Sequence, residues 1–178
     1  MFYLHSYSHD RAYLLTTTKM FFYTTDTGRS WNNLQGPAPP NTFGASILHF
    51  HPTSSDSLIW VGNENCENNG ENCHATAYYS LKNGRDWDVV ETYVRNCAWA
   101  RDEELKIDRT QIICESYRDK RGNQRNFLVL SNPLQFVMGT GYFSKKTILF
   151  DRVVGFAKFS EFLIVAEVIH DQVPLYIY

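Results

Sequence analysis

Short apolar and aromatic runs alternate with polar turns along the chain. The runs span four to eight residues, and several follow the two-residue period of a half-buried strand. No stretch shows a sustained helical period. The pattern therefore predicts an all-β fold, with strands over residues 11–18, 20–25, 31–34, 47–51, 58–62, 75–81, 88–95, 111–117, 127–130, 153–159, 162–168 and 174–178.

The turn after the aromatic run at residues 21–23 carries the pattern Ser/Thr-x-Asp-x-Gly-x-x-Trp, called an Asp box. Thr24, Asp26, Gly28 and Trp31 occupy its four places. The Asp26 carboxylate can accept hydrogen bonds from N–H groups of its own turn, and Gly28 can adopt positive φ. Trp31 is expected to re-enter the sheet and bury its ring. A hairpin turn explains every residue type, so we favour it over the alternative of a catalytic acid at Asp26.

A degenerate copy of the box lies 56 residues further on. Ser80, Gly84 and Trp87 are in register with the first box, but Lys82 stands where the aspartate should be. Asn83 precedes the glycine, and Asn-Gly favours a two-residue hairpin turn. We expect the boxes to be structural in both copies.

An internal repeat of strand-rich units, each with one characteristic turn, is typical of a radial β architecture. A proline-rich linker at residues 36–41 separates the first two units, because proline blocks ladder hydrogen bonds. No Asp box occurs in residues 136–150, although the glycines there suggest a bend. The sequence predicts a partial β-propeller of about three blades, with units roughly at 1–36, 45–95, 96–151 and 152–178, the first and last incomplete.

A partial propeller leaves its end faces without neighbouring blades. We expect open apolar faces near Phe21 and Phe22 in the first unit and near Phe162 and Ile164 in the last. We also expect the terminal strand, residues 174–178, to lack a partner.

The four cysteines allow three disulfide pairings. Cys66 and Cys73 flank a short polar loop, whereas Cys97 and Cys114 flank a stretch that could bring two strands together, so we favour these two pairs. A metal site on Cys66, Cys73 and His74 is the alternative, but it lacks the Cys-x-x-Cys spacing of structural zinc sites. Disulfides would indicate an oxidising compartment.

His49 and His51 are two residues apart on one expected strand and therefore share a face. A metal site is possible there, but we favour positions in the wall or core of the sheet. No metal and no other cofactor is expected.

Composition excludes several partner classes. The net charge is −2, the pI is near 6.3 and no basic patch stands out, so nucleic acid is not an expected partner. The longest apolar run, residues 162–166, is too short to span a membrane, and the first residues lack the features of a signal peptide. The lack of a signal peptide conflicts with the oxidising compartment that disulfides would indicate, and a truncated chain would resolve the conflict.

Four stretches of the chain, beginning with the first Asp box, resemble the luminal propeller of the sortilin family, in its fungal vacuolar-sorting branch. The box alone is weak, because sialidases and many secreted propellers use it, whereas the second and fourth stretches are specific. The resemblance covers nearly the whole chain and rests on residues 23–31, 93–100, 114–117 and 153–163.

The resemblance implies a type I membrane receptor with a ten-bladed luminal propeller, a cysteine-rich module, a membrane span and a cytosolic sorting tail. Such a receptor binds hydrolase precursors or other peptides in the late Golgi and releases them in endosomes. We therefore expect this chain to be a fragment of a cargo-binding domain in the secretory lumen, with no enzymatic activity. Its membrane association would come only through parts absent here. Which residues contact cargo is not implied.

Two alternatives remain. A sialidase-type glycoside hydrolase also carries Asp boxes, but it needs an arginine cluster and a tyrosine nucleophile, and no such arginine motif precedes the first box. A truncated, non-functional receptor remnant would carry the same residues.

Overall fold

The computed structural model describes residues 2–5, 8–16, 20–39, 47–63, 75–100, 110–117, 134–159, 162–167 and 175–177. The described residues are all-β. The first sheet comprises β1 (Phe2–Leu4), β2 (Ala12–Leu15), β3 (Phe21–Thr24) and β4 (Asn32–Leu34). The second comprises β5 (Leu48–Phe50), β6 (Leu58–Asn63), β7 (Ala75–Ser80), β8 (Asp88–Trp99), β9 (Ile112–Ser116), β10 (Leu134–Thr140), β11 (Lys145–Phe159), β12 (Phe162–Glu167) and β13 (Leu175–Ile177).

Within each sheet, the four-stranded one and the nine-stranded one, consecutive strands pair antiparallel. The second sheet is divided because β8 and β11 each change partner along their length. Residues 88–94 of β8 pair with β7, and residues 94–99 pair with β9. In β11, residues 145–153 pair with β10 and residues 153–159 with β12.

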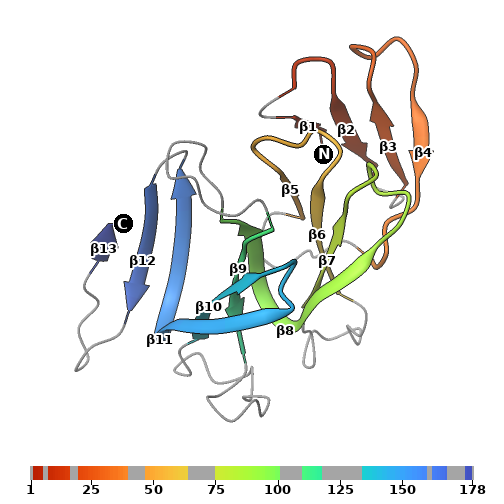
Figure 1. Cartoon of the computed structure of the whole chain (residues 1–178). Helices are drawn as coiled ribbons and strands as arrows, with labels where there is room; N and C mark the ends of the chain where they lie inside the picture. The colour runs from red at the N-terminus through yellow and green to blue at the C-terminus, as the bar shows by residue number, and fades with distance from the viewer. Residues whose placement is uncertain are drawn as a thin grey trace.

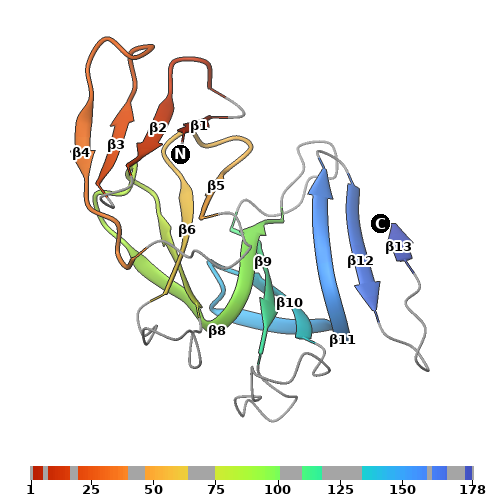
Figure 2. The ribbon, with the colours of Figure 1, turned by 180° about the vertical axis from the view of Figure 1, so that it is seen from behind.

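Four units therefore follow one another along the chain (Figure 1). Unit 1 is β1–β4, and unit 2 is β5–β7 with the first part of β8. Unit 3 is the second part of β8, β9, β10 and the first part of β11. Unit 4 is the second part of β11, β12 and β13. Figure 2 shows from behind that unit 1 and β13 lie at opposite ends of the molecule.

The two partner changes share one backbone device. Tyr93 and Arg152 adopt φ of 56° and 66°, a conformation that few non-glycine residues take. The valine that follows each of them, Val94 or Val153, is fully buried and faces partners in both adjoining units. A register shift comes directly after each valine. The same kink therefore turns one continuous strand from the last of a unit into the first of the next.

Three apolar cores lie between successive units, because alternate residues of a strand point to opposite faces. On β9, Ile112 and Cys114 face unit 2, whereas Ile113 faces unit 4. The first core joins units 1 and 2 and includes Tyr13, Leu15, Phe21, Leu34, Leu58, Trp60 and Tyr78. The second, between units 2 and 3, includes Ile59, Val61, Ala77, Val90, Trp99, Val137 and Phe143. The third, between units 3 and 4, includes Ala98, Phe136, Val153 and Val165. The all-β, propeller-type expectation is confirmed.

Several details differ from the sequence-based expectations. The pattern missed β1, β10 and the first part of β11. Strand β1 gives unit 1 four strands, although that unit was expected to be incomplete. Residues 88–95 and 153–159 are parts of the longer strands β8 and β11. The expectation that the terminal strand lacks a partner is wrong, since β13 pairs with β12. The strand expected at 127–130 lies outside the described residues.

The expected open face of unit 1 also needs correction. Phe21 is 1% exposed and packs toward unit 2 in the first core. Phe22, the next residue, points to the other face and is half-buried beside Leu14, its partner on β2. Only Phe22 therefore belongs to the outer face. In unit 4, Ile164 is half-buried and its neighbour Val165 enters the third core.

Candidate functional site: the turns and strands that join the units

The first Asp box is a closed network of hydrogen bonds within one turn. The Thr24 hydroxyl donates to Asp26 Oδ1 (2.7 Å) and accepts from the backbone N–H groups of Asp26 (3.3 Å) and Gly28 (3.0 Å). The Asp26 carboxylate also accepts from the Ser30 N–H (2.9 Å) and the Ser30 hydroxyl (2.6 Å). Ser30, which the motif leaves open, is thus a main partner of the aspartate.

These donors stabilise the charged form of the carboxylate. The Ser30 hydroxyl, then the Ser30 N–H and the Thr24 hydroxyl, lower the pKa of Asp26 to about 2. A general acid at neutral pH needs a raised pKa, so the shift has the wrong direction for that chemistry. Asp26 acts as an ionised acceptor that holds the turn.

The second box repeats the geometry with different chemistry. The Ser80 hydroxyl accepts from the N–H groups of Lys82 (3.2 Å) and Gly84 (2.8 Å), as Thr24 does in the first turn. The Lys82 ammonium donates to the Asp86 carboxylate (2.7 Å). An exposed ion pair between positions i and i+4 therefore replaces the aspartate–serine contact of the first box.

Asn83 fastens this second turn to unit 1. Its N–H donates to the carbonyl of Asp56 (2.8 Å), and its side-chain amide donates to the Asp56 carboxylate (2.7 Å). Its side-chain oxygen accepts from the guanidinium of Arg11 (2.6 Å) and the hydroxyl of Tyr13 (3.2 Å), both on unit 1. Thr27, the equivalent residue of the first box, donates its N–H to the carbonyl of Asp10 (3.0 Å). Both residues have positive φ, 54° for Asn83 and 61° for Thr27.

The turn between β7 and β8 contains seven residues, 81–87, rather than the expected two. The Asn-Gly pair still supplies its positive φ angles, with Gly84 at 78°. A Cβ on Gly84 would lie 2.7 Å from Leu34 Cδ2 and 2.9 Å from the Trp87 ring. The glycine is therefore needed both for its conformation and because β4 of unit 1 packs directly on it.

The two box tryptophans have different surroundings. Trp87 is half-buried at the margin of the first core, where its ring meets Trp60 edge-on with centroids 6.1 Å apart. Trp31 is 40% exposed, so the expectation of a buried ring is wrong. The largest buried side chains are Trp60 and Trp99, which lie outside both motifs.

In unit 3 the equivalent turn, between β10 and β11, uses aromatic packing. Tyr142 and Phe143 have consecutive positive φ angles of 53° and 74°. Phe143 is buried in the second core, and Tyr142 stacks on Tyr79 of unit 2 with centroids 4.8 Å apart. Each of the three turns joins the third and fourth strands of its unit, and each carries at least one aromatic side chain.

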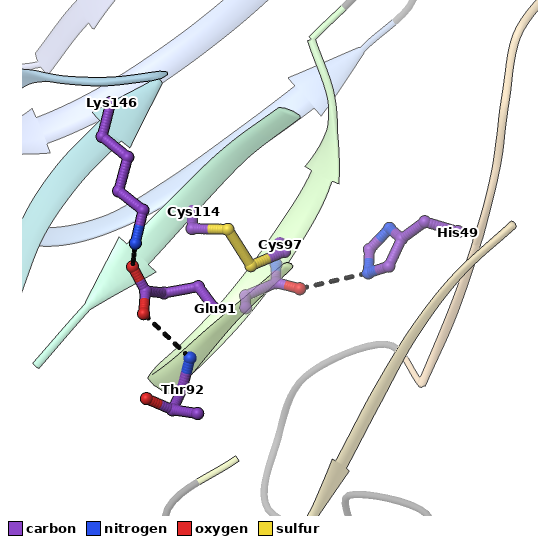
Figure 3. Close-up of a disulfide and its surroundings, with 7 residues drawn as sticks. His49, Glu91, Thr92, Cys97, Cys114 and Lys146 are labelled. Atoms are coloured by element: carbon purple, nitrogen blue, oxygen red, sulfur yellow. Dashed lines mark hydrogen bonds and ion pairs between the residues drawn. A yellow bond between two sulfur atoms is a disulfide. The ribbon is translucent and has the colours of Figure 1, made fainter. Parts of the chain in front are cut away.

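A disulfide joins Cys97 and Cys114, as predicted (Figure 3). The two residues are direct cross-strand partners on β8 and β9, with Cα atoms 4.2 Å apart, and both are fully buried in the second core. The expected pair of Cys66 and Cys73, and the alternative metal site with His74, lie outside the described residues.

Polar side chains connect the first strands of successive units. His49 on β5 lies 3.1 Å from Asn96 Oδ1 on β8, and Figure 3 shows the imidazole directed toward β8. His51 is buried, its Nδ1 accepts from two backbone N–H groups, and its ring contacts Trp99 at 4.7 Å. Both histidines thus occupy wall or core positions. Within the described ranges, no three His, Cys, Asp or Glu side chains are grouped to hold a metal ion.

Glu115 makes the corresponding link between units 3 and 4. Its buried carboxylate accepts two hydrogen bonds from Arg95, at 2.8 Å from Nε and 2.6 Å from one terminal nitrogen. The backbone N–H of Phe156, on the second part of β11, donates to the same carboxylate (2.9 Å). A bidentate arginine partner and a backbone donor together satisfy the buried charge.

Comparison with known proteins shows to which family the chain belongs. A family model for Sortilin-Vps10, described as sortilin, neurotensin receptor 3, matches residues 1–178. This chain belongs to the Sortilin-Vps10 family.

Two fungal proteins illustrate the similarity to curated relatives. The chain is 59% identical over 171 residues to the vacuolar protein sorting/targeting protein 10 of Laccaria bicolor, covering 96% of the chain and 12% of that protein. It is 47% identical over 165 residues to the protein of the same name from Mycosarcoma maydis, covering 92% and 11%. The chain therefore spans a small part of the length of these relatives. Among solved structures, the GH74 enzyme of Niastella koreensis is similar with a TM-score of 0.48 and 14% identity, covering 93% of this chain and 21% of that one.

Sequence reasoning found the turns of this Sortilin-Vps10 chain but missed the residues that join its units. The contacts that Asn83, Arg95, Glu115 and Phe143 make at the joints between units could not be read from a local motif, because their partners lie on other strands or turns. One signal was available: Asn83 differs from Thr27 at an equivalent position of the repeat, and the Asn83 amide makes the side-chain contacts with Arg11 and Tyr13 of unit 1. The described residues contain no helix, and thus none of a length and apolarity to cross a membrane.

Proposed function

We propose that this chain forms part of the luminal cargo-binding propeller of a sorting receptor, which carries hydrolase precursors from the Golgi toward endosomes and the vacuole. The observation that carries the proposal is family membership over residues 1–178, together with relatives named for vacuolar protein sorting. Its units, divided near residues 36, 95 and 151, are successive blades of the receptor propeller.

The geometry supports a binding scaffold without chemistry of its own. The polar groups described above hold turns or join units: Asp26 holds a turn of unit 1, Asn83 joins units 1 and 2, and Glu115 joins units 3 and 4. Three apolar cores fix the units relative to one another. A rigid arc of this kind presents loops and strand edges to a protein or peptide partner.

The compartment we propose is the lumen of the secretory and endosomal pathway. The disulfide between Cys97 and Cys114 fits an oxidising lumen, and the relatives carry a vacuolar-sorting name. Attachment to the membrane would come through receptor segments outside residues 1–178. Cargo is a peptide or protein, with neither nucleic acid nor a cofactor involved.

A chimeric receptor tests the proposal. The matching segment of the Laccaria bicolor relative is replaced by this chain and expressed in a fungal strain that lacks its own receptor. We expect a vacuolar hydrolase precursor, such as that of carboxypeptidase Y, to be retained by these cells and not secreted. Resistance of the chimera to limited proteolysis confirms that it is folded.

A folded chimera that reaches the right compartment but leaves the hydrolase secreted would contradict the proposal. The hydrolase alternative is tested separately with a fluorogenic sialoside and the purified chain. Turnover of that substrate would favour the glycoside-hydrolase interpretation, and we expect none.

A further inference from the structure

Strand β4 is an edge strand that is open to solvent. Among the described strands it pairs only with β3, and it forms one end of the first sheet (Figure 1). Asn32, Asn33 and Gln35 are exposed, while Leu34 between them is buried in the first core. The strand carries no lysine, proline or bulge of the kind that commonly protects sheet edges.

Pairing on the other side of β3 determines which β4 backbone groups point outward. The N–H of Thr16 donates to the carbonyl of Met20 (2.9 Å), so Met20 turns its backbone toward β2. In an antiparallel ladder the backbone direction alternates along a strand. Phe22 therefore also bonds toward β2, where it faces Leu14. Phe21 and Tyr23 bond toward β4.

The same alternation continues across β4. Phe21 faces Leu34 and Tyr23 faces Asn32, so these two β4 residues bond inward. The N–H and C=O of Asn33 consequently point away from the sheet. The same alternation, continued one residue past the end of β4, directs those of Gln35 outward as well. Residues i and i+2 with outward backbone groups are what an added strand requires.

A pocket lies against this edge. Its volume is about 540 Å³, and both Asn33 and Gln35 line it together with Met20, Pro37 and Trp60. None of its lining residues is charged. An uncharged side chain suits such walls, because a charged one would lose its hydration without gaining an ionic partner.

We propose that the edge of β4 binds an extended peptide, which adds a strand through Asn33 and Gln35 and places an apolar or aromatic side chain in the pocket. Backbone hydrogen bonds then supply affinity for any extended segment, and the pocket selects the side chain. This site goes beyond the function proposed above, since it holds whether or not the receptor sorts hydrolases.

The probes are fluorescein-labelled peptides of sequence Lys-Thr-Val-X-Thr-Lys, with both ends blocked. X is Phe, Asp or Gly, and a fourth peptide carries Phe with N-methylated backbone amides flanking it. Fluorescence polarisation with the complete chain, held at low micromolar concentration, should show binding of the Phe peptide. The Asp, Gly and N-methylated peptides should bind about tenfold or more weakly.

Two variants of one residue separate backbone from side-chain effects. Asn33→Pro removes the outward N–H, and an edge strand tolerates this change because that N–H makes no bond within the sheet. Asn33→Ala keeps the N–H. We expect about fivefold to tenfold weaker binding for Asn33→Pro and a clearly smaller loss, about twofold, for Asn33→Ala, which keeps the N–H and trims one wall residue of the pocket. Equal melting temperatures would confirm that both variants are folded.

Hydrogen exchange provides a second measurement. The Phe peptide should slow exchange at the amides of Asn33 and Gln35 and leave those of β9 unchanged. Equal binding of the Phe, Asp and N-methylated peptides, no binding up to millimolar concentration, or equal affinity of the Pro and Ala variants would each overturn the proposal. None of these results bears on the chimera experiment, so the two proposals fail independently.

Discussion

The two Asp-box turns differ both in how complete their motif is and in how closely they pack against another unit. The first keeps the complete motif, and its carboxylate is held by Ser30 and Thr24, yet its Trp31 ring is 40% exposed. The second has lost the aspartate, but Leu34 packs on its glycine and Asn83 fastens it to unit 1. The second turn packs on the unit that precedes it, as Tyr142 of unit 3 does on Tyr79 of unit 2, whereas no described unit precedes unit 1. Within this chain, the turn with the poorer motif therefore makes the more extensive contacts with another unit.

This difference separates two contributions of an Asp box: the hydrogen bonds that organise its own turn, and the packing of that turn against a neighbouring unit. Thr24 and Ser80 organise their turns in the same way, by accepting the N–H of the glycine four residues later. That local function survives without the aspartate. What each turn contributes to stability beyond this depends on the neighbouring unit, whose residues the motif does not include.

The glycines should show the largest contrast. Gly84→Ala places a Cβ against Leu34 and Trp87 in a positive-φ backbone, and we expect a loss of about 2–5 kcal/mol in the free energy of unfolding. Gly28→Ala has the same φ problem, but its nearest contact would be Trp31 at 3.9 Å. Its loss should be about 1–2 kcal/mol. Urea unfolding of both variants measures the difference, and equal losses would refute the contrast.

The tryptophans should follow the same order. Trp87→Ala removes a half-buried ring that packs on Trp60, and we expect it to cost about 2–4 kcal/mol. Trp31→Ala removes a ring with much of its surface in water, so about 1 kcal/mol is expected. Thermal unfolding followed by circular dichroism gives both values. A larger loss of stability for Trp31→Ala than for Trp87→Ala would mean that the burial of the ring does not determine its contribution to stability.

The residues before the glycines differ in their side-chain contacts. Asn83→Ala leaves Arg11, Tyr13 and Asp56 without the amide, and we expect a cost of about 1–3 kcal/mol. Thr27→Ala keeps its backbone contact with Asp10 and should change stability by less than about 0.5 kcal/mol. Matching effects in denaturant titrations of the two variants would disprove the asymmetry.

The acid response should distinguish the boxes even where energies are small. The pKa of Asp26 is lowered to about 2, so its stabilising effect is complete above its ordinary value near 3.8 and is lost as pH falls from about 4 toward 2. Asp26→Ala should flatten this part of the stability profile, whereas Lys82→Ala should leave it unchanged. Melting temperatures between pH 2 and pH 5 provide the check, and an unaltered profile for Asp26→Ala would contradict the assignment.

Local patterns were enough to predict much of the fold. The period of two, the glycine turns and the repeat of 56 residues predicted the propeller class and most strands, though not β1, β10 or the first part of β11, and strand proximity predicted the pair of Cys97 and Cys114. These features depend on residues that are near in sequence or on adjacent strands. The sequence predicted less well on which face of its strand each residue lies: Phe21 and Phe22 were both expected on the open face of unit 1, and only Phe22 lies there.

The contacts between units could not be predicted in the same way. Whether Trp31 or Trp87 is covered depends on which strand lies opposite, and no signal within either box contains that information. Likewise, the kinks at Tyr93 and Arg152 use non-glycine residues in a glycine-like conformation, so the sequence shows no turn there. Both are consequences of tertiary packing.

A double-mutant cycle between Leu34 and Gly84 tests the central claim most directly. If Leu34 packs on Gly84, then Leu34→Ala makes room for the added methyl group, and the double variant should be more stable than the sum of the single losses by about 1 kcal/mol or more. The matched cycle of Leu34→Ala with Gly28→Ala should be additive. Additive losses in the Gly84 cycle, or equal coupling in both cycles, would contradict the conclusion that unit 1 covers the second turn.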